Sequence, residues 1–192
     1  MLFIKRTLDI VFSLLLIILL CPVMLLEALL IKCTVPGDIF FDQVRVGKGK
    51  KGFYILKFRT MAERGGKEGQ VVGIGWFLRR TKLDELPQLM NILWGDMSFV
   101  GPRPYVEDEG LNLPDERYIV RPGLTGLAQV NGNKYLPWDE RTAYDIKYVR
   151  NLSLGLDLKI ILKTFLVVLL GEEKFVHHLE GWENGHVEET DG

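Results

Sequence analysis

The sequence predicts an α+β protein, in which an N-terminal helix enters the membrane and a small cytoplasmic α/β domain with interfacial amphipathic helices follows. Residues 10–31 form an almost uninterrupted apolar run. Residues 38–46 and 53–60 alternate roughly as strands do, and residues 76–94 repeat leucine and methionine at helical spacing. These three patterns together predict a membrane segment joined to a mixed domain.

Length, charge and cysteine usage limit the possible functions. The chain has 192 residues, enough for one domain of ordinary size, and a formal net charge of −1. A nearly neutral chain has no global field to attract nucleic acid, so we expect no nucleic-acid partner and only local anion sites. Its two cysteines, Cys21 and Cys33, form neither a disulfide framework nor a metal-ligand spacing.

The apolar run is long enough to insert into a bilayer. A straight helix over residues 10–31 would measure about 33 Å, and Glu27 is its one charged residue. A cleaved secretory signal is the competing interpretation, but the run is too long and no small-x-small cleavage site follows it. We therefore predict that residues 1–34 form a membrane helix in the mature protein.

Two features bear on the path of this helix through the membrane. Pro22, near the middle of the run, removes a backbone hydrogen bond and bends a helix at a cost of about 3 kcal/mol. Basic residues flank both ends and favour the cytoplasm there: Lys5, Arg6, Lys32, Arg45, Lys48, Lys50 and Lys51. From the residues alone, a re-entrant helix broken at Cys21-Pro22 and a kinked spanning helix are equally favoured.

The two strand-like segments are joined by the glycine-rich residues 47–52, which read GKGKKG. These letters match the G-x-G-x-x-G dinucleotide fingerprint, but the fingerprint requires a helix after the loop and here a second strand follows. We therefore predict a hairpin turn. The polar, glycine-rich residues 62–75 are predicted to form a loop.

Two adjacent carboxylates, Asp84 and Glu85, lie in the helical stretch of residues 76–94, which is predicted in one or two pieces. Thr81 and Asp84 are alternative helix N-caps, and Pro87 suits a first helical turn. A carboxylate at a helix start has a structural explanation in the helix dipole. Judged on this stretch alone, a capping role is favoured over a catalytic one.

Several arginines are stiffened by their neighbours. Arg103 lies between two prolines in GPRP, Arg121 precedes Pro-Gly, and Arg79 and Arg80 lie close to the carboxylates. Guanidinium groups bind phosphate oxygens bidentately, so this set predicts a phosphate site. Carboxylates near arginines, without a P-loop or a catalytic triad, suit phosphate chemistry with Mg²⁺. The membrane segment suggests that one substrate is a lipid.

The C-terminal third contains two further helical patterns and an acidic tail. Residues 139–150 read as a surface helix. Residues 156–171 are apolar, but they are too short and too charged to span, so we predict a core or interfacial helix. Residues 172–192 are predicted to be a tail, in which His177 and His178 are incidental rather than metal ligands.

Four ordered motifs carry a family resemblance: KFRTM, LRRTKLDELPQLMNILWGDMSFVGPRP, RPGLTGLAQVNG and YVRNLSLGLDLKIIL. Together they closely resemble the bacterial monotopic phosphoglycosyl transferases, over about residues 1–165 and in the minimal catalytic form. The resemblance implies a catalytic domain at residues 35–171 on the cytoplasmic face of the bacterial inner membrane. It also favours the re-entrant path for residues 1–34.

The resemblance also implies an activity. A phospho-sugar moves from a UDP-sugar to polyprenol phosphate, with undecaprenyl phosphate as the expected lipid, and UMP is released. The implied mechanism is ping-pong with Mg²⁺, and the reaction is the first membrane step of glycoconjugate assembly. The alternative is a catalytically silent, membrane-anchored scaffold of the same fold, and a homodimer contact through the membrane helix is compatible with either.

Residue roles are implied in the same way. Asp84 would be the nucleophile that takes the phospho-sugar and would bind the metal, and Glu85 would assist. Arg79 matches an arginine at the lipid-phosphate site. The remaining matches are expected to line the active site and hold phosphates or uridine: Lys57, Arg59, Arg103 and Arg121.

Two positions depart from the family pattern. Cys21 precedes Pro22 where serine is common, and a thiol is a weaker hydrogen-bond partner for freed carbonyls. Asn133-Lys134 follows the QVNG motif, where many relatives have arginine directly after the glycine. We expect Lys134 to supply the substrate-binding cation there.

Overall fold

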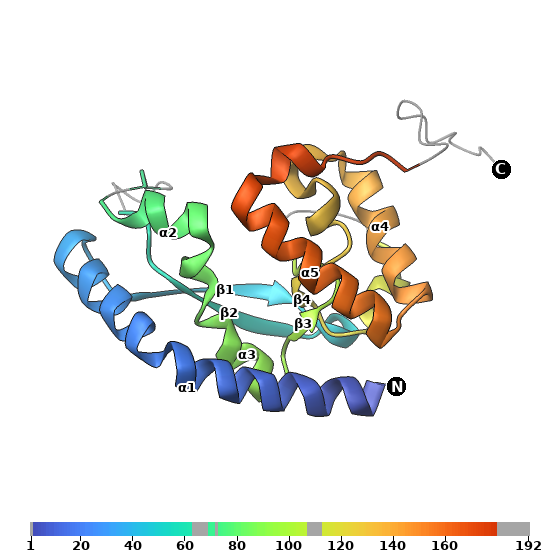
Figure 1. Cartoon of the computed structure of the whole chain (residues 1–192), viewed down its shortest axis with the longest axis horizontal. Helices are drawn as coiled ribbons and strands as arrows, with labels where there is room; N and C mark the ends of the chain where they lie inside the picture. Colours follow the sequence, from blue (N-terminus) through green and yellow to red (C-terminus); the bar gives the residue numbers. More distant parts are fainter. Residues whose placement is uncertain (1, 63–68, 72, 107–112, 180–192) are drawn as a thin grey trace.

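A computed structural model describes residues 2–62, 69–71, 73–106 and 113–179 of the chain. It confirms a mixed helical and sheet architecture with one long N-terminal helix (Figure 1). Half of the loop predicted at residues 62–75, and the tail from residue 180 onward, lie outside the described residues.

Helix α1 (Leu2–Thr34) runs along one side of the domain and bends toward its C-terminal end (Figure 1). The predicted interruption at Cys21-Pro22 is not present, because the helix continues through Pro22. A proline inside a helix removes one backbone hydrogen bond, which bends the helix without ending it. Among the described residues, α1 is the one helix long and apolar enough to cross a membrane.

Most of the fully buried side chains of α1 are polar. Lys5 forms an ion pair of 2.7 Å with Asp157, and the carboxylate of Asp9 accepts hydrogen bonds from Ser98 Oγ and the backbone N–H of Phe99. Ile18, Leu19 and Leu25, by contrast, are each 66% exposed. A helix with its polar side chains toward protein and its apolar side chains outward has the arrangement expected of a lipid-facing helix.

The predicted hairpin is confirmed. Strand β1 (Phe40–Val46) pairs antiparallel with β2 (Gly52–Phe58), and the turn between them is the short helix η1 (Lys48–Lys50). Gly49 in this turn has φ of 65°, a left-handed conformation that glycine adopts without steric cost. The GKGKKG letters therefore form a turn and not a dinucleotide loop.

The helical stretch predicted at residues 76–94 consists of three pieces: α2 (Gly75–Thr81), η2 (Leu83–Glu85) and α3 (Gln88–Trp94). Lys82 interrupts it with a left-handed φ of 60°. Neither predicted cap forms. The Thr81 hydroxyl donates to the carbonyls of Phe77 and Leu78, and neither η2 nor α3 has a side-chain cap. The predicted capping roles of Thr81 and Asp84 are therefore wrong.

A second, parallel pair of strands brings the two arginine-proline loops together. Strand β3 (Ser98–Val100) pairs with β4 (Gly123–Thr125). Glycines permit this close approach, because a Cβ at Gly101 would lie 2.3 Å from the backbone oxygen of Arg121. A Cβ at Gly126 would lie 2.1 Å from the backbone oxygen of Gly101.

Three short helices, η4 (Asp115–Ile119), η5 (Gln129–Asn131) and η6 (Asn133–Tyr135), lead into α4 (Trp138–Arg150) and α5 (Leu154–Leu170). Helix α5 packs one face against the core of the second half of the chain through Ile160 and Val167. Leu158, Phe165 and Leu169 on its other face are exposed. An apolar helix that is half buried and half exposed agrees with the prediction of a core or interfacial helix.

Part of the predicted tail packs on the domain. The helix η7 (Glu172–Phe175) follows α5. Tyr144 Oη donates to the carbonyl of His177, and His178 Nδ1 lies 2.8 Å from the buried carboxylate of Glu140. The ordered domain therefore continues past the predicted boundary at residue 171, to residue 179 at least.

Candidate active site

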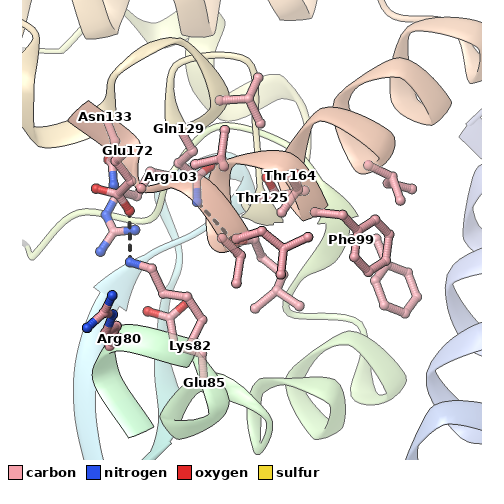
Figure 2. A pocket seen from close by; sticks show the side chains of 18 of the residues that line it. Arg80, Lys82, Glu85, Phe99, Arg103, Thr125, Gln129, Asn133, Thr164 and Glu172 are labelled. Atoms are coloured by element: carbon pink, nitrogen blue, oxygen red, sulfur yellow. Dashed lines mark hydrogen bonds and ion pairs between the residues drawn. The ribbon is translucent and has the colours of Figure 1, made fainter. Parts of the chain in front are cut away.

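A cleft of about 840 Å³ lies between α1, η2 and α5. Its polar end is lined by Arg79, Arg80, Lys82, Glu85, Arg103, Asn133, Lys134 and Glu172. Its other end is lined by apolar side chains, among them Phe12, Leu16 and Leu20 of α1 and Phe165 of α5. Figure 2 shows the charged groups gathered at one end, with Phe99 far from them at the other. The cleft is therefore amphiphilic, and its apolar end is formed by the two helices with exposed apolar faces.

Asp84 is held in the short helix η2, directly after the left-handed Lys82. It is 8% exposed, and its Oδ1 has no hydrogen-bond partner among the described residues. Burial raises the pKa of Asp84 to about 6, with a further contribution from the charge of Glu85, against the opposing charges of Lys57, Lys82 and Arg79. An unpaired buried carboxylate with a raised pKa is typical of a reactive group.

Glu85 has the opposite environment. Its carboxylate accepts from Lys57 Nζ at 2.7 Å. Burial alone would raise the pKa of Glu85, but the charges of Lys57 and Arg103 outweigh it and hold the pKa at about 2. The pKa values of the two neighbouring carboxylates therefore differ, and Glu85 is ionised at neutral pH. Glu85 lines the cleft, whereas Asp84 is not among the described residues that do so.

The predicted cations divide into two groups. Arg79, Arg103 and Lys134 line the cleft, and Lys57 reaches the site through Glu85. Arg59 lies 3.9 Å from Asp38, and Arg121 Nε donates to the carbonyl of Gly95 at 2.6 Å. Arg59 and Arg121 are not among the described residues that line the cleft, so the geometry gives no support to a direct substrate contact for either.

Arg103 is held from behind by a buried ion pair. The Arg117 guanidinium donates to the carbonyl of Arg103, and its Nε lies 2.9 Å from Asp145 Oδ2. The side chains of Arg117 and Asp145 are 2% and 1% exposed. Because proline also restricts Arg103 on both sides, the fold fixes the backbone that carries this cation.

Sequence reasoning gave no role to several polar residues of the cleft, among them Lys82, Asn133 and Glu172. Lys82 Nζ lies 2.8 Å from Glu172 Oε1, and Asn133 hydrogen-bonds the same carboxylate. Lys82 stands next to the carboxylate motif and could have been found from its position. No sequence pattern pointed to Glu172, because it begins the acidic stretch that was predicted to be a tail.

The donor set is compatible with a single divalent cation. Among the described residues no three His, Cys, Asp or Glu side chains form a metal-binding group. Mg²⁺ takes only one or two carboxylates when substrate phosphates supply the remaining oxygens. The unpartnered Asp84 Oδ1 fits this role. Glu27 of α1, which the charge of Asp84 influences, is also buried with both oxygens unpartnered among the described residues.

Comparison with known proteins identifies similar chains. Residues 1–171 match the family model described as bacterial sugar transferase. The exopolysaccharide production protein ExoY of Sinorhizobium fredii is 40% identical over 199 residues. This alignment covers 89% of this chain and 88% of ExoY.

Two further relatives are named for different sugars. The UDP-glucose:undecaprenyl-phosphate glucose-1-phosphate transferase of Caulobacter vibrioides is 44% identical over 182 residues, which cover 83% of this chain and 67% of that protein. The UDP-N-acetylgalactosamine-undecaprenyl-phosphate N-acetylgalactosaminephosphotransferase of Aeromonas hydrophila is 40% identical over 187 residues. That alignment covers 88% of this chain but only 44% of the Aeromonas protein.

Proposed function

Because this chain belongs to the bacterial sugar transferase family, we propose that it moves a phospho-sugar from a UDP-sugar to undecaprenyl phosphate and releases UMP. The observation that carries the proposal is the carboxylate pair at the polar end of the cleft. Asp84 is buried without a partner for Oδ1, while Glu85 beside it is paired with Lys57. Such a division of two adjacent carboxylates suits one reactive group and one fixed charge.

The proposed chemistry has two displacements at one phosphorus atom. A carboxylate oxygen of Asp84 attacks the phosphorus that carries the sugar, and UMP leaves with the oxygen that bridged the two phosphates. An oxygen of the lipid phosphate then attacks the same phosphorus, and the bond to Asp84 breaks. The products are a free carboxylate and a lipid diphosphate sugar. Since Glu85 and not Asp84 forms the cleft wall, substrate binding has to open Asp84 to the cleft.

The cations of the cleft have complementary tasks in this proposal. Arg79, Arg103 and Lys134 attract and orient phosphate groups, which are otherwise repelled by the carboxylates. Lys57 keeps Glu85 ionised and fixed in place. Mg²⁺, held by Asp84, would supply further neutralisation of phosphate charge.

The apolar end of the cleft suits the hydrocarbon chain of a polyprenol phosphate. Phe12, Leu16 and Leu20 of α1 and Phe165 of α5 line it. Both helices also have exposed apolar faces, so the cleft is continuous with surfaces that suit lipid. A lipid phosphate can therefore approach the cations while its tail remains in apolar surroundings.

A panel of UDP-sugars tests the activity. We expect the full chain in detergent micelles, with Mg²⁺ and undecaprenyl phosphate, to release UMP from one or a few sugars of the panel. UDP-glucose and UDP-N-acetylgalactosamine belong in it because the relatives are named for these sugars. Absence of UMP release with every sugar, in a folded protein, would favour the membrane-anchored scaffold instead.

We also propose that α1 re-enters the cytoplasmic face of the inner membrane. The curvature of α1 toward its C-terminal end, the proline inside it and the basic residues at both ends support this path. In a Cys21→Ser, Cys33→Ser background, we expect Leu2→Cys and Lys48→Cys to react with an impermeant maleimide from the cytoplasmic side only. Reaction of the two positions from opposite sides of sealed vesicles would instead show a spanning helix.

A further inference from the structure

The carboxylate of Glu172 occupies the polar end of the cleft. Gly171, with φ of 98°, ends α5 and turns the chain so that η7 begins at Glu172. The Glu172 side chain is 14% exposed, accepts from Lys82 Nζ at 2.8 Å and is hydrogen-bonded by Asn133. Figure 2 shows its carboxylate facing Lys82, with Asn133 and Arg103 beside it.

The surroundings of Glu172 are those of an anion site. Burial would raise the pKa of this carboxyl, but hydrogen bonding and charge from Lys82, hydrogen bonding from Asn133 and the charge of Lys134 outweigh burial and lower it. These donors come from separate parts of the chain, and Lys82 lies two residues before Asp84. Ammonium and amide donors that converge on carboxylate oxygens can serve phosphate oxygens equally well.

We propose that Lys82, Asn133 and Lys134 form a phosphate subsite, and that the Glu172 carboxylate fills it until a substrate phosphate displaces it. This inference rests on the proposed function, because it places a substrate phosphate beside the carboxylate pair. A diphosphate carries more negative charge than one carboxylate, so it competes favourably for the same donors. The phosphate belongs either to the nucleotide diphosphate or to the lipid phosphate.

The exchange has a structural route. Glu172 is attached to α5 through the positive-φ Gly171, and η7 is a single short turn. Releasing the Lys82–Glu172 ion pair and the hydrogen bond from Asn133 therefore frees the Glu172 side chain while α5 keeps its own packing. Lys82, once released, remains next to the carboxylate pair and can follow the phosphate.

Calorimetric titration of the full chain in micelles tests the subsite, with UDP in one arm and farnesyl phosphate in the other. Removing the competing charge by Glu172→Gln is expected to tighten binding of the phosphate that uses the subsite by about tenfold. The arm that responds identifies the source of the phosphate. Glu172→Ala is also expected to tighten binding. Agreement between the two variants would show that the effect comes from loss of the carboxylate and not from a new contact of the glutamine amide.

Glu173→Gln is the matched control. It removes the same charge one residue away, from an exposed side chain that also lines the cleft but has no hydrogen bond or ion pair to the described residues. The subsite is overturned if neither arm responds to the Glu172 variants, or if Glu173→Gln has the same effect. UMP release by the wild type distinguishes failure of the subsite from failure of the proposed function. If the wild type releases UMP but the Glu172 variants bind both ligands as the wild type does, only the subsite is contradicted. If the wild type neither releases UMP nor binds either ligand, the proposed function is contradicted as well.

Discussion

Asp84→Asn is expected to lower the rate of UMP release by a factor on the order of 10⁴, while the protein still folds. The amide oxygen of asparagine is a far weaker nucleophile than a carboxylate, so the first displacement loses its attacking group. Folding is expected to survive, because Asp84 Oδ1 has no hydrogen-bond partner among the described residues and burial of its charge is unfavourable.

The measurement is single-turnover UMP release from the UDP-sugar, followed by mass spectrometry of the protein. Without lipid acceptor, the wild type is expected to gain the mass of one phospho-sugar on the peptide that contains Asp84. Asp42→Asn, an exposed carboxylate on β1, is the control and is expected to keep wild-type activity. Full activity of Asp84→Asn, or an adduct on Glu85 instead, would contradict the assignment.

Arg117→Met is expected to destabilise the protein by about 3–5 kcal/mol. It removes the partner of Asp145, whose side chain is 1% exposed, and leaves a buried carboxylate uncompensated. Burial already raises the pKa of Asp145 to about 6 against the charge of Arg117. The substitution also removes the donor to the Arg103 carbonyl, so weaker substrate binding is expected as well.

Thermal or chemical unfolding in detergent measures this effect, and Arg150→Met is the matched control. Arg150 pairs with Glu116 at 2.8 Å, but its side chain is 66% exposed, so its loss is expected to change the stability little. Adding Asp145→Leu to Arg117→Met is expected to recover part of the stability, because no unpaired charge then remains. Equal effects of Arg117→Met and Arg150→Met would contradict the argument from burial.

Local patterns predicted the elements whose causes are local. The alternation of residues 38–46 and 53–60 and the glycines between them predicted the hairpin, and its antiparallel register confirms it. The helical spacing of residues 76–94 was predicted, but the left-handed Lys82 divides the stretch. Propensity favoured a cap at Asp84, and the cap failed because the tertiary surroundings of η2 determine where that side chain lies.

By itself, the sequence determined the apolar N-terminal helix, the family and the carboxylate pair, because periodicity and ordered motifs are properties of neighbouring residues. Only the tertiary structure decided which charges meet. Lys57 pairs with Glu85 across β2 and η2, and Lys82 meets Glu172 from the end of α5. The pKa of a carboxylate depends on burial and on charges within a few ångströms, and these are set by packing between distant segments. That is why Asp84 and Glu85, adjacent in sequence, differ in environment.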